Sequence, residues 1–125
     1  MIPVERALER SRDDLKAASH LSTGGFLRQA TSRSYYAAFH AAEATLLSLG
    51  ETRSKHSGVV AAFGELVVRP GGFDEETARV LRSLFDRRNA ADYVGGPITA
   101  EDADRAIADA EGFVRAVEAW LMERP

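Results

Sequence analysis

The chain has 125 residues, 45% of them hydrophobic and 28% charged, with no cysteine and a formal net charge of −3. A chain of this length is expected to form one domain, residues 1–125, with a substantial core. The absence of cysteine excludes disulfides, thiolate metal sites and cysteine nucleophiles, and the acidic balance excludes a surface that is basic throughout.

Apolar residues recur at helical spacing in the first half of the chain. The first predicted helix, 4–19, is followed by a glycine-containing loop. The second, 26–49, is the longest, and a glycine ends it. Its apolar stripe consists of Tyr35, Phe39, Ala42, Leu46 and Leu49. The third predicted helix, 55–68, ends at a turn that contains proline and two glycines.

Capping residues mark the last two predicted helices. Asp74 is the expected N-cap of the fourth helix, 74–93. Thr99 and Asp102 have the spacing of a capping box, which opens a fifth helix whose apolar stripe extends to Leu121.

The pattern predicts an all-α fold, because no segment of any length shows the apolar–polar alternation of a β-strand. Short loops between long amphipathic helices indicate an antiparallel up-and-down bundle of four to five helices. The N-terminal segment is charged from Glu5 onward, and the longest apolar runs fall far short of the ~20 residues of a membrane-spanning helix. We therefore expect a cytoplasmic protein with no membrane partner.

The histidines do not have the spacing of metal ligands. His20, His40 and His56 are far apart in the sequence, without the i, i+3 or i, i+4 pairing that places two ligands on one helix face. The glycine pairs lack the lysine and the frame of a phosphate-binding loop. We expect neither a metal ion nor a cofactor.

A polar stripe runs beside the apolar stripe of the second predicted helix. It contains Arg33, Tyr36, His40 and Glu43, at steps of three and four residues that place them on one helix face. Two interpretations remain open for this face. It is either a binding surface or a partly solvated, ion-paired face in which His40 pairs with Glu43.

The fourth predicted helix places an arginine, Arg88, where its apolar stripe should continue. Its polar neighbours are Arg87, Asn89, Asp92 and Tyr93. A permanently charged guanidinium on such a stripe needs an anion or a carboxylate beside it. One interpretation is an internal salt bridge of Arg88 to Asp92 or to Glu43. The other is a phosphate-binding cleft, because a guanidinium suits bidentate oxyanion contacts.

Three ordered blocks of the sequence resemble a known family. They are SRSYYAAFHAAEATLLSLG (32–50), KHSGVVAAF (55–63) and LFDRRNAADY (84–93). Together they resemble the HEPN domain family, and more closely its small stand-alone members with YYAxFHAA and RxxADY motifs. The resemblance spans roughly residues 30–117. It implies a helical bundle that forms a homodimer, with a cleft between the two copies.

The resemblance also implies a chemistry for the fourth helix. Many HEPN proteins are metal-independent ribonucleases, in which an arginine and a polar residue are followed by a histidine. An arginine stabilises the charge that develops on the phosphate, and a histidine moves protons. Arg88 and Asn89 match the first two positions, but Tyr93 stands where the histidine is expected. A phenol is a poor general base at neutral pH, so His40 or His56 would have to substitute.

The family implies a partner as well. Small HEPN proteins are commonly encoded beside a minimal nucleotidyltransferase, as toxin and antitoxin. In some pairs the transferase adds AMP to a tyrosine near the HEPN motif. Tyr93 is the candidate here, although the modified tyrosine normally lies two residues after the histidine, at the place of Gly95.

Three functions therefore remain open. The first is a module that binds RNA or a nucleotide, or docks on a nucleotidyltransferase, through Arg88, Asn89 and Tyr93 without cleaving RNA. The second is a metal-independent ribonuclease toxin that cleaves RNA in a dimer cleft. The third is a structural dimerisation domain whose polar residues satisfy one another. Replacement of the expected histidine by Tyr93 favours the first.

Overall fold

Five α-helices make up most of the chain. The computed structural model describes residues 3–124, so the ends of the expected single domain, residues 1–2 and 125, lie outside the described residues. The α-helices are α1 (Pro3–Thr23), α2 (Leu27–Ser48), α3 (His56–Phe63), α4 (Glu75–Asn89) and α5 (Ala100–Met122). Residues 3–124 contain no β-strand, which confirms the prediction of an all-α fold.

The predicted N-caps of α4 and α5 are confirmed. The Asp74 carboxylate accepts a hydrogen bond from the backbone N–H of Thr77 at 2.9 Å. At the start of α5, Thr99 Oγ1 accepts from the N–H of Asp102 at 3.0 Å, and the Asp102 carboxylate accepts from the N–H of Thr99 at 3.1 Å. These bonds satisfy N–H groups that the first helical turn leaves without partners, and so fix where each helix begins.

Three helix ends differ from the prediction. The third and fourth helices are α-helical only to Phe63 and Asn89, and the chain continues in two π-helical segments, Gly64–Val68 and Ala90–Val94. The backbone N–H that closes the second segment bonds five residues back, at 3.2 Å. The first helix continues beyond residue 19, to Thr23. Apolar spacing does not resolve these ends, because one extra residue in a single turn barely shifts a side-chain stripe.

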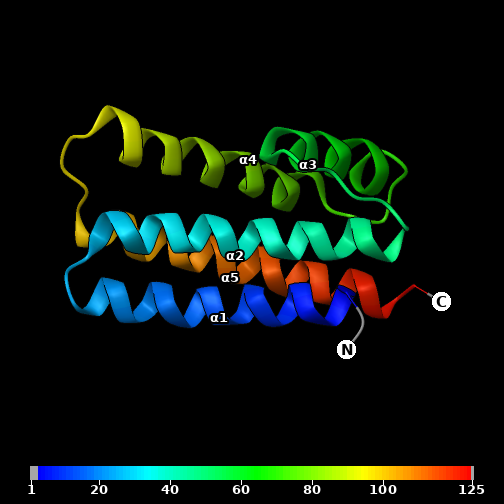
Figure 1. Cartoon of the computed structure of the whole chain (residues 1–125), viewed down its shortest axis with the longest axis horizontal. Helices are drawn as coiled ribbons and strands as arrows, with labels where there is room; N and C mark the ends of the chain where they lie inside the picture. The colour runs from blue at the N-terminus through cyan, green and yellow to red at the C-terminus, as the bar shows by residue number, and fades with distance from the viewer. Residues whose placement is uncertain (1–2, 125) are drawn as a thin grey trace.

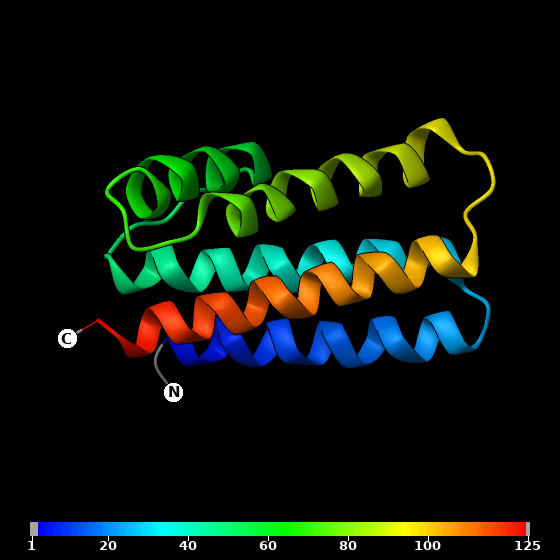
Figure 2. The ribbon, with the colours of Figure 1, turned by 180° about the vertical axis from the view of Figure 1, so that it is seen from behind.

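The helices form an antiparallel up-and-down bundle, as predicted. α1 and α4 run in one direction and α2 and α5 in the other (Figures 1 and 2). α3 lies beside α4 and covers the C-terminal half of α2. Both described chain ends lie at one end of the bundle, and the α1–α2 and α4–α5 loops lie at the other (Figure 1).

α2 is the central helix, in contact with each of the other four. Its buried small residues allow the neighbouring helices to approach closely; they are Ala30, Ser34, Ala37, Ala38, Ala41, Ala42 and Ala44. The predicted apolar stripe of this helix is buried from Tyr35 to Leu46, whereas Leu49 at its end is half-buried. α2 therefore carries the core on one side and leaves its polar stripe on another.

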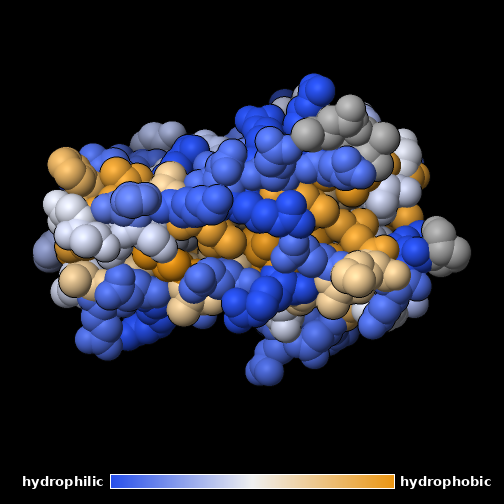
Figure 3. Space-filling model, turned by 90° about the horizontal axis from the view of Figure 1, so that it is seen from below, coloured by the Kyte–Doolittle hydropathy of each residue, from blue (hydrophilic) through white to orange (hydrophobic). Residues whose placement is uncertain are grey.

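The outer face of the bundle is mixed in polarity. Seen from the α1 side, hydrophilic side chains cover most of the surface, and apolar side chains show between them along the middle (Figure 3). Within residues 3–124, no helix is both long enough and apolar enough to cross a membrane.

Candidate phosphate-binding site

Arg88 lies on the side of α4 that faces α2, and its side chain is only 18% exposed. Its Nη2 donates to the Tyr36 hydroxyl at 3.1 Å, and its Nη1 donates to Asn89 Oδ1 at 3.4 Å. Nε lies 3.2 Å from Asp92 Oδ2 without the alignment of a hydrogen bond, so this contact is an ion pair. The structure therefore contains the Arg88–Asp92 salt bridge. In residues 3–124, no ion pair joins Arg88 to Glu43.

Tyr36 connects Arg88 to a second arginine. The guanidinium carbon of Arg33 lies 4.5 Å from the centre of the Tyr36 ring, and that of Arg88 lies 5.4 Å from it. Both are cation–π distances. Arg33 Nη1 also donates to Asp14 Oδ1 of α1 at 3.0 Å. A carboxylate of α1 thus balances the charge of Arg33, and Tyr36 contacts both guanidinium groups.

The rest of the polar stripe of α2 adjoins this group. His40 is buried, with its Nδ1 3.1 Å from Glu43 Oε1 and its Nε2 3.6 Å from Asp14 Oδ2. The expected His40–Glu43 pair is therefore present, with Asp14 as an additional acidic neighbour. This stripe is an ion-paired face, and it stands directly beside the side chain of Arg88.

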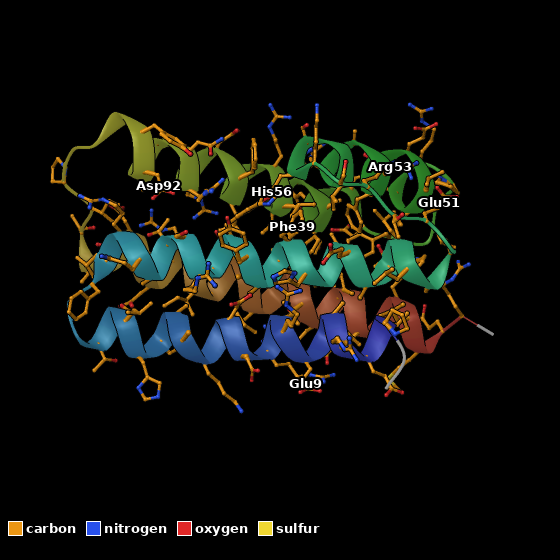
Figure 4. All side chains as sticks on the ribbon, in the orientation of Figure 1. Glu9, Phe39, Glu51, Arg53, His56 and Asp92 are labelled. Carbon is orange, nitrogen blue, oxygen red and sulfur yellow. The ribbon has the colours of Figure 1, made fainter. Side chains whose placement is uncertain are left out.

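A second histidine reaches the site from α3. The His56 ring stacks on Phe39 at 4.3 Å between centroids (Figure 4), and its Nδ1 lies 3.0 Å from the Tyr35 hydroxyl. Burial lowers the pKa of His56 below its ordinary value of 6.5, and the positive charge of Arg88 lowers it further. Burial also raises the pKa of the Tyr35 phenol above its ordinary range. At neutral pH, His56 is therefore a neutral imidazole and Tyr35 a protonated phenol.

Two residues of the predicted site lie elsewhere. Arg87 turns towards α5, where its Nη2 donates to Asp109 Oδ2 at 2.8 Å. It lines a pocket of about 280 Å³ with residues of the α4–α5 loop, including Pro97 and Ile98. Tyr93 lies in the π-helical segment and is 78% exposed. Among the described residues, neither side chain forms a hydrogen bond or an ion pair with Arg88, so both lie outside its cluster.

The cluster offers a cation and hydrogen-bond donors to an oxyanion. We define the Arg88 cluster as Arg88, Asn89, Asp92, Tyr36, Tyr35 and His56. In the part of the chain that the structure describes, no group of three or more histidine, aspartate and glutamate side chains is placed to hold a metal ion. The groups of this cluster that could act on a ligand are one guanidinium, two phenols, one imidazole, one amide and one carboxylate.

Sequence reasoning missed two members of this neighbourhood and left a third open. Asp14 was missed because the packing of α1 on α2 places it there, and no local pattern reveals that packing. Tyr35 was treated as core, although a buried tyrosine needs a partner for its hydroxyl, which was the available signal. His56 was one of two candidates to replace the expected histidine, and the fold brings it to the cluster from the start of α3.

Comparisons with known proteins show one family. The family model described as "HEPN domain" matches residues 4–120. A protein of Methanocaldococcus jannaschii with the name "Putative toxin MJ0605" is 34% identical over 120 residues, which are 96% of this chain and 90% of that protein. A protein of Thermotoga maritima named "UPF0332 protein" is 36% identical over 117 residues, 92% of this chain and 88% of that one. The crystal structure of TT1696 from Thermus thermophilus superposes with a TM-score of 0.81 and 20% identity, covering 96% and 99% of the two chains.

Proposed function

The chain belongs to the HEPN domain family, and we propose that it is a toxin-like binding module in which Arg88 receives a phosphate group of RNA or of a nucleotide. The toxin designation of the Methanocaldococcus jannaschii relative supports the first part of this proposal. The surroundings of Arg88 support the second part.

The observation that carries the proposal is the incomplete pairing of a largely buried guanidinium. Only Nη1 and Nη2 of Arg88 make hydrogen bonds within residues 3–124, to Asn89 and Tyr36, and the bond to Asn89 is long at 3.4 Å. Nε is buried without a hydrogen-bond partner among these residues. A charged group removed from water is costly unless its donors are satisfied. A phosphate oxygen would satisfy the remaining donors and add charge-assisted hydrogen bonds.

Substitution of Arg88 tests this directly. The purified protein is titrated into a short fluorescein-labelled oligouridylate without added metal at neutral pH, and binding is followed by anisotropy. Arg88→Ala should weaken binding about ten- to a hundred-fold, the effect of losing hydrogen bonds to a charged group. Arg88→Lys should lie between wild type and alanine, because lysine keeps the charge and loses the planar fork.

Arg79→Ala is the matched control, since Arg79 is an exposed arginine of the same helix. Equal weakening by Arg79→Ala and Arg88→Ala would show a diffuse charge effect and contradict the proposal. Unchanged binding by a folded Arg88→Ala protein would contradict a phosphate contact of Arg88 and favour the third function, a structural dimerisation domain. The integrity of the RNA at the end of the titration provides the readout for the ribonuclease alternative, in which cleavage depends on Arg88.

Docking of a minimal nucleotidyltransferase is the partner function we propose, and the accessibility of Tyr93 supports it. Tyr93 is one of three exposed large hydrophobic side chains among the described residues, and at 78% exposure its hydroxyl is open to an incoming enzyme. Incubation with such a transferase and ATP should transfer one AMP to the Tyr93 hydroxyl with release of pyrophosphate, and mass spectrometry detects the added mass. Tyr93→Phe should abolish the addition of AMP. Unchanged addition to this variant would show that another residue is modified and contradict the assignment of Tyr93.

Self-association accompanies this proposal. We propose a homodimer in which the Arg88 clusters of two copies line one cleft. The resemblance of this chain to HEPN domains, which implies a dimer with a cleft between the two copies, supports this proposal. Light scattering at micromolar concentration should give twice the mass of one chain, and a monomer mass would contradict a shared cleft.

A further inference from the structure

His56 occupies a position that the proposed phosphate contact of Arg88 does not yet use. It is the first residue of α3, and its ring lies against three aromatic rings of α2. Two of these rings, Tyr35 and Tyr36, also contact the guanidinium of Arg88, at 5.7 and 5.4 Å from its central carbon. The imidazole and the guanidinium thus share the same pair of α2 tyrosines.

The hydrogen bond between Tyr35 and His56 has a definite direction. The Tyr35 side chain is fully buried, and its hydroxyl lies 3.0 Å from His56 Nδ1, its hydrogen-bond partner within residues 3–124. If His56 donated from Nδ1, the Tyr35 proton would be buried without an acceptor, which is costly. Tyr35 therefore donates and Nδ1 accepts. A neutral histidine that accepts at Nδ1 carries its proton on Nε2.

The Nε2–H group is the free end of this arrangement. In the described chain His56 Nε2 has no hydrogen-bond partner, yet it is not among the buried polar atoms that lack one, so it is open to solvent. We infer that His56 donates this Nε2–H to an oxygen of the same phosphate that Arg88 receives, with Tyr35 as the residue that positions the imidazole. The inference deepens the proposed function and rests on it, since it concerns the same bound phosphodiester.

The charged and titratable groups around His56 fit a neutral donor. Arg88 on α4 and His40 on α2 lower the pKa of His56, in addition to burial, and Glu43 on α2 opposes them. Protonation would also place the second proton of the ring on Nδ1, where it would face the Tyr35 hydroxyl that donates to this nitrogen. His56 therefore gives the site a hydrogen bond without a second full positive charge.

This arrangement also separates binding from cleavage. With Nδ1 occupied by Tyr35 and Nε2 protonated, neither nitrogen of neutral His56 has a free lone pair to accept a proton from a ribose hydroxyl. The imidazole can hold a phosphate oxygen, but it cannot serve as general base while Tyr35 holds Nδ1. Recognition of a phosphodiester is thus the chemistry to which the pair is suited.

Nitrogen NMR measures the state of the ring. In protein labelled with ¹⁵N-histidine at neutral pH, long-range ¹H–¹⁵N correlations should show a protonated Nε2 and a bare Nδ1 for His56. Tyr35→Phe removes the hydroxyl and keeps the ring, so the two tautomers should then interconvert. Addition of the oligouridylate should shift the His56 Nε2 signal and leave the signals of exposed His20 in place. A protonated Nδ1 in the free protein would overturn the inference.

Binding of the same oligouridylate separates this inference from the proposed function. His56→Phe keeps an aromatic ring on Phe39 and removes the N–H, so binding should weaken about ten-fold; His20→Phe should have no effect. Circular dichroism and urea unfolding check that His56→Phe is folded, and the NMR shift in wild-type protein stands if it is not. The inference alone is overturned if binding depends on Arg88, survives His56→Phe, and leaves the His56 Nε2 signal of the wild-type protein unshifted. Absence of binding by the wild-type protein overturns the proposed function, and the phosphate contact of His56 with it.

Discussion

At the scale of single residues, the strength of the site depends on how Arg88 is balanced. Asp92 faces it at 3.2 Å, and Tyr36 accepts one of its hydrogen bonds. The carboxylate lowers the free-energy cost of burying the cation in the free protein, but it would repel a phosphate that approaches the same guanidinium. We therefore expect Asp92 to compete with a phosphate ligand for Arg88.

Asp92→Asn tests that competition. The amide keeps the shape of the side chain and removes its charge, so we expect the oligouridylate to bind several-fold more tightly. Stability should fall slightly, because a partly buried cation loses its counter-charge. Anisotropy titration and urea unfolding of the same sample measure the two effects. Weaker binding by a folded Asp92→Asn protein would show that the carboxylate itself contacts the ligand.

His56 predicts a pH dependence of stability. Its pKa is lowered in the folded protein, so between that value and 6.5 the unfolded chain binds more protons than the folded chain. The contribution of His56 to stability is then fully present above pH 6.5 and is lost as the pH falls below it. The free energy of unfolding, measured in urea, should therefore decrease from about pH 7.5 to pH 5.5.

His56→Phe should flatten this dependence, and His20→Phe should preserve it. The two aspartates with altered pKa values do not interfere. Asp74 accepts hydrogen bonds from Thr77, and Asp102 accepts from the backbone N–H of Thr99; these bonds lower the pKa of both carboxyl groups and keep them ionised over this range. A wild-type protein that becomes more stable on acidification from pH 7.5 would contradict the assignment.

The predictability of these residues follows from how local their signals are. Arg88 was recognisable because its charge interrupts an apolar stripe, which is visible within one helix. The His40–Glu43 and Arg88–Asp92 pairs were predictable for the same reason, as they join residues three and four apart. Asp14 and the Tyr35–His56 bond were not, because they join residues of different helices whose packing no short pattern specifies.

At the scale of elements, the helix starts were more predictable than the ends. Asp74 and Thr99 predict the starts of α4 and α5, because each side chain caps the backbone N–H of the residue three positions later. The π-helical ends of the third and fourth helices depend on which carbonyl an N–H reaches, and apolar spacing contains little information on that choice. The second π-helical segment matters for the proposed function, because it carries both Asp92 and Tyr93.

Asp74→Ala measures the contribution of a cap. The Asp74 carboxylate accepts hydrogen bonds from both the N–H and the hydroxyl of Thr77, at 2.9 and 2.8 Å. Loss of such a cap typically costs ~1 kcal/mol, so the free energy of unfolding in urea should decrease by about that amount. Asp13→Ala, at an exposed position inside α1, should change it by less than about half as much. Equal effects would show that the cap contributes nothing specific.

At the scale of the whole molecule, the net charge of −3 requires a focused site rather than a basic surface. Carboxylates balance the charges of two neighbouring arginines: Arg33 forms an ion pair with Asp14, and Arg87 forms one with Asp109. Arg87 and Arg88 each keep a buried Nε without a hydrogen-bond partner within the described chain. Arg88 has the less exposed side chain, 18% against 31%, and two tyrosine rings beside its guanidinium, so it is the arginine best placed to exchange a carboxylate for a phosphate. The body of the protein should repel a polyanion while this one cluster attracts it.

The salt dependence of binding distinguishes that arrangement from a spread of weak contacts. Each phosphate neutralised on single-stranded nucleic acid contributes about −0.7 to the slope of log K against log salt concentration. One Arg88 cluster should therefore give a slope near −0.7, and two clusters in a dimer cleft about −1.4. Anisotropy titrations of the oligouridylate over a range of salt concentrations measure it, and Arg79→Ala should leave the slope unchanged. A slope of about −4 or steeper would mean that many cations contact the strand, and Arg88 would then be one member of a broad electrostatic surface rather than its centre.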